Sequence, residues 1–322
     1  MDVGQGDATL LQGPDFTILV DAGRHDRNDV VPYLKNLGIE SIDLLIGTHP
    51  HADHIGQFPE VLEAFDVHEV WMSGGLHTTL IFERTLDAIL ASNAAYNEPR
   101  RGDSFVFGSA NIDVLSPHEL IGDLNDDSVV TRIQFGDVSF LFAGDAEIEA
   151  EREMVNSGLD LFATILQVGH HGSRTSSTIG FLEAVQPEVA IYSAGRDNRY
   201  GHPHQEIVQR YDQMDISLYG TDQYGTIIIE SDGIGYNVIF SRSDTLREPI
   251  AIDDSLSTEC ININTAGTDE LSEIIHIGPS RASDLILNRP FNSLEELIQL
   301  SGMGSTRVEA IIAEGLACVE TQ

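Results

Sequence analysis

Hydrophobic and polar positions follow two alternating patterns along residues 1–240. Short runs rich in β-branched and aromatic residues, such as residues 16–20 and 42–47, predict buried strands. Between them, apolar residues recur every three or four positions, as in residues 29–37 and 79–93, which predicts amphipathic helices. Many strands with interspersed helices indicate layered sheets that are covered by helices.

The other predicted elements of this region show the same two patterns. Further strands are predicted at residues 8–11, 67–72, 105–115, 129–135, 138–142, 161–168, 189–192, 226–231 and 235–240. Further helices are predicted at residues 55–65, 147–156, 179–185 and 205–213. We therefore expect residues 1–240 to form one large α/β domain.

The pattern changes after residue 240. Residues 241–259 are polar and lack periodicity, which predicts an interdomain linker. Residues 260–322 contain four short helical patterns, interrupted at Gly278 and again at Gly302 and Gly304. This region is predicted to be a small all-α domain with a degenerate internal repeat.

The charge of the chain is strongly negative. With 17 basic and 52 acidic residues the formal charge is −35, and Lys35 is the single lysine. An acidic surface with almost no lysine suits a protein that stays solvated in strong salt, although an ordinary acidic protein is the alternative. This composition argues against a large basic groove for nucleic acid. Any nucleic acid would be held by metal ions, backbone amides and a few arginines.

Other features of the sequence bear on the class of protein. No apolar run reaches the roughly 18–20 residues that a membrane helix needs. The first residues show no signal peptide, but they begin inside a predicted strand, so the compartment and the true start stay open. Only Cys260 and Cys318 are present, which excludes a disulfide scaffold and a cysteine-based metal site.

Seven of the 12 histidines fall in three tight groups, of which the first follows a predicted buried strand. His49 and His51 are two residues apart at the strand end, so both point to one side. Asp53 and His54 open the next helix beside them. Four imidazole and carboxylate ligands within six residues suit zinc or a similar divalent ion.

The second group contains His170 and His171, and the third contains His202 and His204, which could also be structural turn residues. Between the first two groups, an apolar strand ends at Asp145. A carboxylate at that place is expected to bridge two metals, although a helix N-cap is the alternative.

Asp21 repeats the pattern of a strand that ends in an aspartate. We interpret it as a hydrogen-bond partner of a ligating histidine, with a turn aspartate before Gly23 as the alternative.

Several motifs occur together in one order along residues 1–240. They are Asp2-Val3-Gly4-Gln5-Gly6-Asp7, THPHADH at 48–54, Asn125-Asp126-Asp127-Ser128, Gly144-Asp145, HHGS at 170–173 and YGHP at 200–203. This combination resembles the metallo-β-lactamase-fold domain of the DNA-uptake channel protein ComEC. The resemblance implies an αββα sandwich with two divalent ions, zinc or manganese, between its sheets. The channel's membrane helices are absent from this sequence, and in the channel relatives this domain lies outside the membrane.

The resemblance also implies roles for individual residues. The implied metal ligands are His49, His51, Asp53, His54, Asp145 and His170. The implied catalytic or substrate-facing residues are Asp53, Asp145, Ser173 and His202. His171 is the less favoured of its pair, because Gly169-His170 matches the superfamily's Gly-His step. Asn125 lies near the position where many members have a further histidine ligand.

Residues 260–322 resemble tandem helix-hairpin-helix modules, closest to those of the competence DNA receptor ComEA. Such hairpins present backbone N–H groups to a DNA phosphate. The implied DNA-binding residues are Gly278, Gly302, Gly304, Arg281 and Arg307. His276 stands where the first hairpin usually has a glycine, and acidic residues outnumber arginines in this region. A protein-binding or purely structural role is therefore the alternative.

Residues 1–240 resemble the hydrolase-like domain of one DNA-uptake protein, and residues 260–322 resemble the DNA-binding region of another. Because both relatives handle DNA, the two resemblances together point to DNA as the substrate. We expect a metal-dependent phosphodiesterase, and specifically a nuclease that acts on DNA. The alternatives are a metallo-hydrolase related to phosphorylcholine esterases or lactonases, and a non-catalytic DNA-binding surface protein. The sequence leaves the oligomeric state open.

Overall fold

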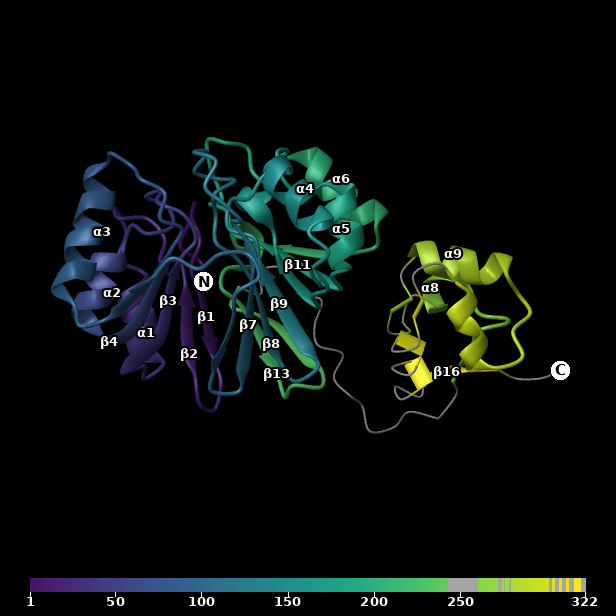
Figure 1. Cartoon of the computed structure of the whole chain (residues 1–322). Helices are drawn as coiled ribbons and strands as arrows, with labels where there is room; N and C mark the ends of the chain where they lie inside the picture. The colour runs from purple at the N-terminus through teal and green to yellow at the C-terminus, as the bar shows by residue number, and fades with distance from the viewer. Residues whose placement is uncertain are drawn as a thin grey trace. The chain divides into compact units, whose positions relative to one another are not determined.

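The computed structural model describes residues 1–242, 260–271, 274, 276–277, 279–300, 303–304, 307–308, 311–312 and 316–319. The chain divides into two compact units, Met1–Thr245 and Leu246–Gln322 (Figure 1). This division falls inside the predicted linker at residues 241–259, most of which lies outside the described residues.

The first sheet of unit 1 has the strand order β1-β2-β3-β4-β5. Its strands are β1 (Thr9–Gln12), β2 (Thr17–Val20), β3 (Ser41–Gly47), β4 (Asp66–Met72) and β5 (Ala95–Asn97). β1 and β2 form an antiparallel hairpin, whereas β2 to β5 run parallel. Residues 44–47 of β3 are all buried, as expected of a parallel strand that is covered on both faces.

The second sheet has the order β12-β11-β10-β9-β8-β7-β6. Its strands are β6 (Ser104–Phe107), β7 (Ala110–Ser116), β8 (Val130–Phe135), β9 (Val138–Phe142), β10 (Ile165–Gln167), β11 (Val189–Tyr192) and β12 (Ser217–Gly220). β6 to β9 pair antiparallel, and β9 to β12 pair parallel. A separate hairpin joins β13 (Ile227–Ser231) to β14 (Tyr236–Phe240).

The predicted strand at residues 105–115 is two strands in the structure. β6 and β7 are joined by a tight turn at Gly108, whose φ of 54° lies in the left-handed region that favours glycine. The apolar pattern continues through this turn, which is why the sequence alone suggested one strand. β5, β12 and the short helix α7 (Thr221–Tyr224) were not predicted at all.

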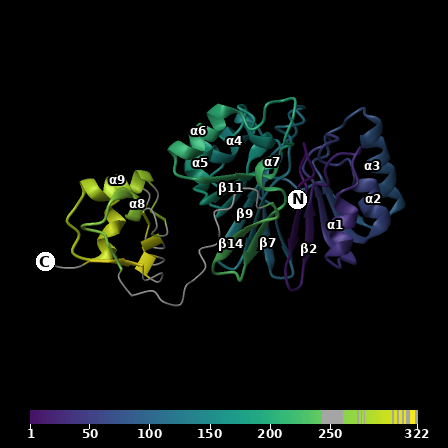
Figure 2. The same cartoon turned by 180° about the vertical axis from the view of Figure 1, so that it is seen from behind.

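Helices cover the outer face of each sheet (Figures 1 and 2). The first sheet carries α1 (Val30–Asn36), α2 (Phe58–Ala64) and α3 (Leu80–Ala91). The second sheet carries α4 (Ile148–Asn156), α5 (Ile179–Val185) and α6 (Gln205–Gln213). The bounds of α5 and α6 are those that the sequence pattern predicted.

Three apolar cores separate the four layers of unit 1. The core between the first sheet and its helices includes Leu34, Leu45, Val61, Val70 and Phe82. The core between the second sheet and its helices includes Leu141, Met154, Leu166, Phe181 and Ile207. The core between the two sheets includes Ile18, Leu44, Trp71, Ile112 and Ile133. The predicted αββα sandwich is therefore confirmed.

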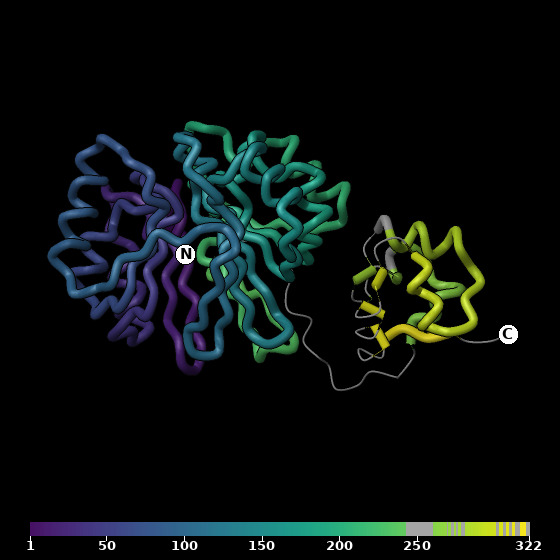
Figure 3. The backbone as a smooth tube through the Cα atoms, in the orientation of Figure 1, coloured from purple at the N-terminus to yellow at the C-terminus, as the bar shows by residue number. Residues whose placement is uncertain are grey.

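The backbone passes once from one half of unit 1 to the other. Figure 3 traces it from the purple and blue half, which holds β1 to β5, into the teal and green half, which holds β6 to β14. The N-terminus lies at the junction of the two halves in both cartoon views (Figures 1 and 2). Segments that follow β3, β9 and β10 also reach this junction, and they carry the first histidine group, Asp145 and the second histidine group.

Unit 2 has its own apolar core, built around Ile263, Leu285, Phe291, Leu297 and Ile311. Its described helical elements are α8 (Thr268–Leu271), α9 (Pro279–Leu287) and the 3-10 helix η2 (Leu294–Gln299). The sequence did not predict the short parallel pair between β15 (Ile261–Asn262) and β16 (Ala317–Cys318). Cys260, which directly precedes β15, and Cys318 of β16 form a disulfide.

Among the residues that the structure describes, no helix has the length and apolar character that crossing a membrane requires.

Candidate metal centre

The first histidine group follows β3 and points into the junction between the two sheets. His49 and His54 are fully buried, and His51 is half-buried. His49 Nε2 lies 2.9 Å from His51 Nδ1, so the two rings share one side as their spacing predicts. The buried strand thus presents its polar residues only at its carboxyl end, where the chain turns toward α2.

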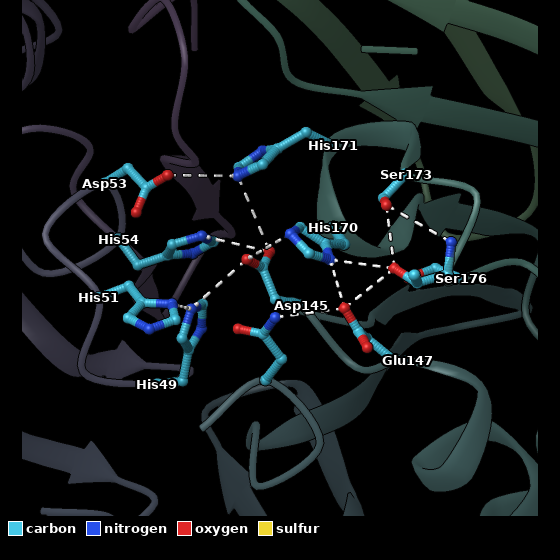
Figure 4. A network of polar contacts seen from close by, with 12 residues as sticks. His49, His51, Asp53, His54, Asp145, Glu147, His170, His171, Ser173 and Ser176 are labelled. Atoms are coloured by element: carbon cyan, nitrogen blue, oxygen red, sulfur yellow. Dashed lines mark hydrogen bonds and ion pairs between the residues drawn. The ribbon is translucent and has the colours of Figure 1, made fainter. Parts of the chain in front are cut away.

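Asp145 occupies the centre of the cluster (Figure 4). It follows β9 and Gly144, whose φ of 54° needs a glycine. Asp145 Oδ1 lies 3.2 Å from His54 Nε2, and its Oδ2 lies 3.5 Å from His49 Nε2. The two oxygens of one buried carboxylate therefore face two different histidines, which is the arrangement of a bridging ligand.

His171 completes the group around His54. His171 Nε2 lies 3.8 Å from Asp145 Oδ1, and His171 Nδ1 lies 3.7 Å from Oδ2 of Asp7. Ligand atoms of Asp7, His54, Asp145 and His171 all lie within 4.8 Å of one another, and all four residues are buried. A second group, His49, His51 and Asp145, meets the same condition. Asp145 belongs to both groups.

His170, which the sequence favoured over His171, lies beside this cluster and makes other contacts. Its Nδ1 lies 2.9 Å from Glu147 Oε1, and its Nε2 lies 3.8 Å from Asp145 Oδ2. The same Glu147 oxygen accepts hydrogen bonds from Thr175 Oγ1 at 2.9 Å and from Asn125 Nδ2 at 3.3 Å. The two adjacent histidines have positive φ angles of 50° and 56°, which turns their rings in different directions.

Asp53 and Asn125 lie at the edge of the cluster. Asp53 Oδ2 lies 3.6 Å from His171 Nε2, and Asp53 belongs to neither group that shares Asp145. The Asn125 amide contacts Glu147 rather than the first histidine group.

Asp21 holds His54 in place, as the sequence indicated. Asp21 Oδ2 accepts a hydrogen bond from His54 Nδ1 at 2.8 Å. The backbone N–H and the hydroxyl of Thr48 also donate to this carboxylate, both at 2.9 Å. With Nδ1 engaged, His54 presents Nε2 to Asp145.

Asp7 and Glu147 are the two site residues to which sequence reasoning gave no role. Asp7 Oδ2 lies 4.0 Å from His54 Nδ1 and 3.7 Å from His171 Nδ1, so its carboxylate contacts both rings of the four-residue group. The Gly-Gln-Gly-Asp motif was a signal for Asp7, because it stood in the resemblance without an assigned function. Glu147 lies two residues after Asp145, at the start of the helix predicted at residues 147–156.

The electrostatics follow from burial of charges of both signs. Burial alone would lower the pKa of His171, but the carboxylates of Asp145 and Asp7 outweigh it and raise the pKa to about 9. Burial likewise opposes protonation of His54, yet Asp145 and Asp21 hold its pKa above the ordinary value. Burial raises the pKa of Asp7 to about 6, although His171 and His54 oppose that rise. Without a cation, the centre therefore retains protons on His54 and His171.

Buried ligand atoms without hydrogen bonds indicate that the residues fit metal ions. Five such atoms have no hydrogen-bond partner among the described residues. They are Oδ1 and Oδ2 of Asp7, Nε2 of His54, Oδ1 of Asp145 and Nε2 of His171. Burying such atoms unpaired is costly, and a cation would satisfy them together. Imidazole nitrogens and carboxylate oxygens suit zinc, and the carboxylates also suit manganese.

His202 and Ser173 lie at the edge of the centre. The ring of His202 stacks against that of His171, with centroids 6.1 Å apart and planes inclined by 28°. Burial first, and then the charges of His171 and His170, lower the pKa of His202 to about 4, so it is neutral at pH 7. Ser173 Oγ contacts Thr175 Oγ1 at 2.9 Å, which links it to Glu147 (Figure 4).

The residues expected to bind DNA are partly described. Gly304 is exposed and follows the buried Met303. Arg281 Nη1 donates to the carbonyl oxygen of His276 at 2.9 Å, within its own hairpin. Arg307 lies at a helical position and is half-buried. Gly278 and Gly302 lie outside the described residues.

Comparisons with known proteins agree with both parts of this picture. A model of the Metallo-beta-lactamase superfamily matches residues 1–196, and a helix-hairpin-helix motif model matches residues 257–314. The chain is 33% identical over 247 residues to ComE operon protein 3 of Bacillus subtilis, a match that covers 70% of this chain and 32% of that protein. It is 30% identical over 239 residues to Recombination protein 2 of Haemophilus influenzae, covering 70% and 28%. These relatives confirm the resemblance to the ComEC family.

A third relative matches this chain over a shorter stretch. A deoxyribonuclease of Thioalkalivibrio sp. is 41% identical over 61 residues, which is 19% of this chain and 17% of that protein. The chain thus spans about a third or less of the length of each of these three relatives.

Proposed function

This chain belongs to the metallo-β-lactamase superfamily, and on that premise we propose that it is a metal-dependent phosphodiesterase that cleaves DNA. The observation behind the proposal is the division of the Asp145 carboxylate between two ligand groups. One oxygen lies 3.5 Å from His49 and the other 3.2 Å from His54, both on buried Nε2 atoms. Two adjacent cation sites with a shared carboxylate suit the clamping of a phosphodiester.

The ligand sets follow from the two groups. His49, His51 and Asp145 would hold the first ion, and Asp7, His54, Asp145 and His171 would hold the second. Divalent ions bound there would neutralise the phosphodiester's charge and activate a water molecule for in-line attack. Asp53, whose Oδ2 lies 3.6 Å from His171 Nε2, would orient the His171 ring and add a further carboxylate beside the second site.

His170 would supply a proton to the leaving oxygen. Glu147 contacts its Nδ1 at 2.9 Å, and this contact orients Nε2 toward the side of Asp145 that faces His49. A histidine that a carboxylate holds in this way can act as a general acid. Thr175 and Asn125 fix Glu147 in turn, so Asn125 would support the proton donor rather than bind a metal.

His202 and Ser173 would contact the substrate from the edge of the centre. His202 is 9% exposed, is neutral at pH 7, and has a buried Nδ1 without a hydrogen bond among the described residues. Such a ring can donate one hydrogen bond to a phosphate oxygen. Ser173 is 5% exposed and would keep the Thr175 hydroxyl oriented toward Glu147.

DNA as the substrate is supported by the second unit and by the relatives. The helix-hairpin-helix motif of residues 257–314 suits the binding of DNA phosphates through backbone amides. A competence operon protein, a recombination protein and a deoxyribonuclease are among the relatives. The competence relatives and the Cys260–Cys318 disulfide also favour action outside the reducing cytoplasm.

Incubation of the full chain with zinc or manganese and end-labelled single- or double-stranded DNA tests this function. We expect DNA cleavage that chelation abolishes, at low and at molar salt. Turnover of a phosphorylcholine ester or a lactone without DNA cleavage would replace the proposal by another metallo-hydrolase. DNA binding without bound metal or turnover would indicate a non-catalytic protein.

A further inference from the structure

Unit 1 contains a cleft of about 590 Å³ that lies beside the metal centre. Two residues of its lining lie two positions along the chain from residues that belong to the centre or contact it. Gln5 and Gly195 line it, and Gly195 N donates to Gln5 Oε1 at 3.3 Å. From Gln5 the chain reaches Asp7, and just before Gly195, the Ser193 carbonyl lies 3.0 Å from His171 Nδ1.

The cleft is rich in arginine although the chain is strongly acidic. Five of the twelve arginines in residues 1–242 line it, against three aspartates, so the lining has a net charge of +2. The formal charge of the whole chain is −35. The five are Arg24, Arg27, Arg196, Arg199 and Arg242. A positive lining in a negative protein marks a place that attracts an anion.

Two of these arginines retain their charge for a ligand. Within residues 1–242, Arg196 and Arg199 form no ion pair, whereas the other three pair with aspartates. Arg196 Nε donates to the carbonyl oxygen of Asp222 at 3.3 Å, and Arg199 Nη2 donates to the Tyr200 hydroxyl at 2.9 Å. Both contacts are with neutral acceptors, so both guanidinium groups can still bind a phosphate.

A row of stacked rings links the cleft to the metal centre. Tyr200 lines the cleft and stacks on His202, with centroids 5.7 Å apart and planes inclined by 23°. His202 in turn stacks on His171 of the centre. The Arg199 guanidinium lies 5.0 Å from the centroid of the Tyr200 ring, and Tyr200 is 49% exposed. An exposed aromatic ring beside a cation is a platform for a flat, unpaired base.

We propose that this cleft binds the backbone of one DNA strand through Arg196 and Arg199, with an unpaired base stacked on Tyr200. The inference rests on the proposed function and adds to it the form of the substrate at the metal centre. A single strand fits, because a base that is paired within a duplex cannot lie on the Tyr200 ring. Phosphates along the cleft would place the next phosphodiester near Asp145.

Binding of a single-stranded oligonucleotide to the metal-loaded full chain tests the cleft. The probe is a labelled phosphorothioate oligothymidylate, which resists hydrolysis, and the readout is fluorescence anisotropy. We expect the double variant R196Q/R199Q to weaken binding about tenfold, and to lower the slope of log Kd against log salt by about 1.4, or about 0.7 for each lost phosphate contact. Tyr200→Ala should weaken binding about tenfold, whereas Tyr200→Phe should retain most of it.

Matched controls lie elsewhere on unit 1. Arg84 and Arg152 are exposed and pair with Glu60 and Glu149 on the outer helices. Tyr96 is 44% exposed, similar to Tyr200. We expect Arg84→Gln, Arg152→Gln and Tyr96→Ala to bind the oligonucleotide like the unchanged protein. A bromodeoxyuridine oligonucleotide should photocrosslink to the peptide that contains Tyr200.

Three outcomes would overturn the assignment. In the first, the double variant R196Q/R199Q binds the oligonucleotide as tightly as Arg84→Gln does. In the second, all crosslinks map to residues 260–322. In the third, inorganic polyphosphate competes for the cleft as well as unlabelled oligonucleotide does, and Tyr200→Ala leaves the affinity unchanged. These outcomes are separate from failure of the proposed function, which would be the absence of DNA cleavage by the unchanged metal-loaded protein.

Discussion

His54 Nε2 and Asp145 Oδ1 face each other at 3.2 Å in the buried junction between the two sheets. His54 arrives from the end of β3 and Asp145 from the end of β9, so the contact joins residues from both halves of unit 1. Neither atom makes a hydrogen bond of normal geometry among the described residues. The pair is therefore prepared for a cation.

Asp145→Asn should lower hydrolysis about a thousandfold or more and reduce bound metal. The amide keeps the shape of the side chain but removes the charge that both ligand groups share. Metal analysis and DNA turnover measure the change. Asp87→Asn, on the exposed face of α3, is the matched control. Unchanged metal content and activity in Asp145→Asn would refute the site.

His171→Ala and His170→Ala should differ. His171 belongs to the four-residue group, so its loss should remove about one metal equivalent. His170 contacts Glu147, so its loss should leave the metal content intact and lower kcat about a hundredfold. Glu147→Gln should share the kcat effect in weaker form. If His170→Ala instead loses the metal, the ligand assignment of the sequence was right and the geometric one is wrong.

Metal affinity should rise with pH between about 6 and 9. The pKa of His171 is raised to about 9, and that of His54 lies above its ordinary value, so the metal-free centre is protonated at pH 7. Binding must displace these protons, so apparent affinity should increase up to about tenfold per pH unit for each proton released. Calorimetry in buffers of different ionisation enthalpy counts the protons. Affinity that stays constant from pH 6 to 8 would contradict this account.

Gly304→Val should weaken DNA binding without unfolding unit 2. A Cβ placed on Gly304 meets no atom of the described residues within 4 Å, and a side chain there would obstruct a DNA phosphate. Removal of residues 246–322 should have a larger effect of the same kind, and raise KM for DNA more than it lowers kcat. Filter binding and steady-state turnover measure both. Undiminished DNA affinity after the deletion would make unit 2 a protein-binding or structural module.

Replacing Cys260 and Cys318 by serine should destabilise unit 2 by about 2–4 kcal/mol. The disulfide closes a loop whose ends are 58 residues apart, and this restricts the unfolded chain. Because the tryptophan and all tyrosines lie in unit 1, hydrogen exchange of peptides from residues 260–319 is the suitable measurement. Equal protection in the variant and the unchanged protein would show that the disulfide contributes little.

The sequence determined the local elements and most of the chemistry. Helices such as α5 and α6 were predictable because their apolar spacing is set by residues three and four apart. The density of ligands at His49, His51 and His54, and the strand that ends at Asp145, pointed to a metal centre for the same local reason. Asp21 was recognisable as a partner because it ends a buried strand.

The tertiary structure decided which of these groups meet. Adjacent residues cannot be told apart by spacing, and only their backbone angles turned the ring of His171 toward Asp145 and that of His170 toward Glu147. Asp7 joined the centre through the packing of the N-terminal segment, 138 positions away in sequence from Asp145. Side-chain directions and long-range contacts depend on how the layers pack, and neither composition nor periodicity contains that information.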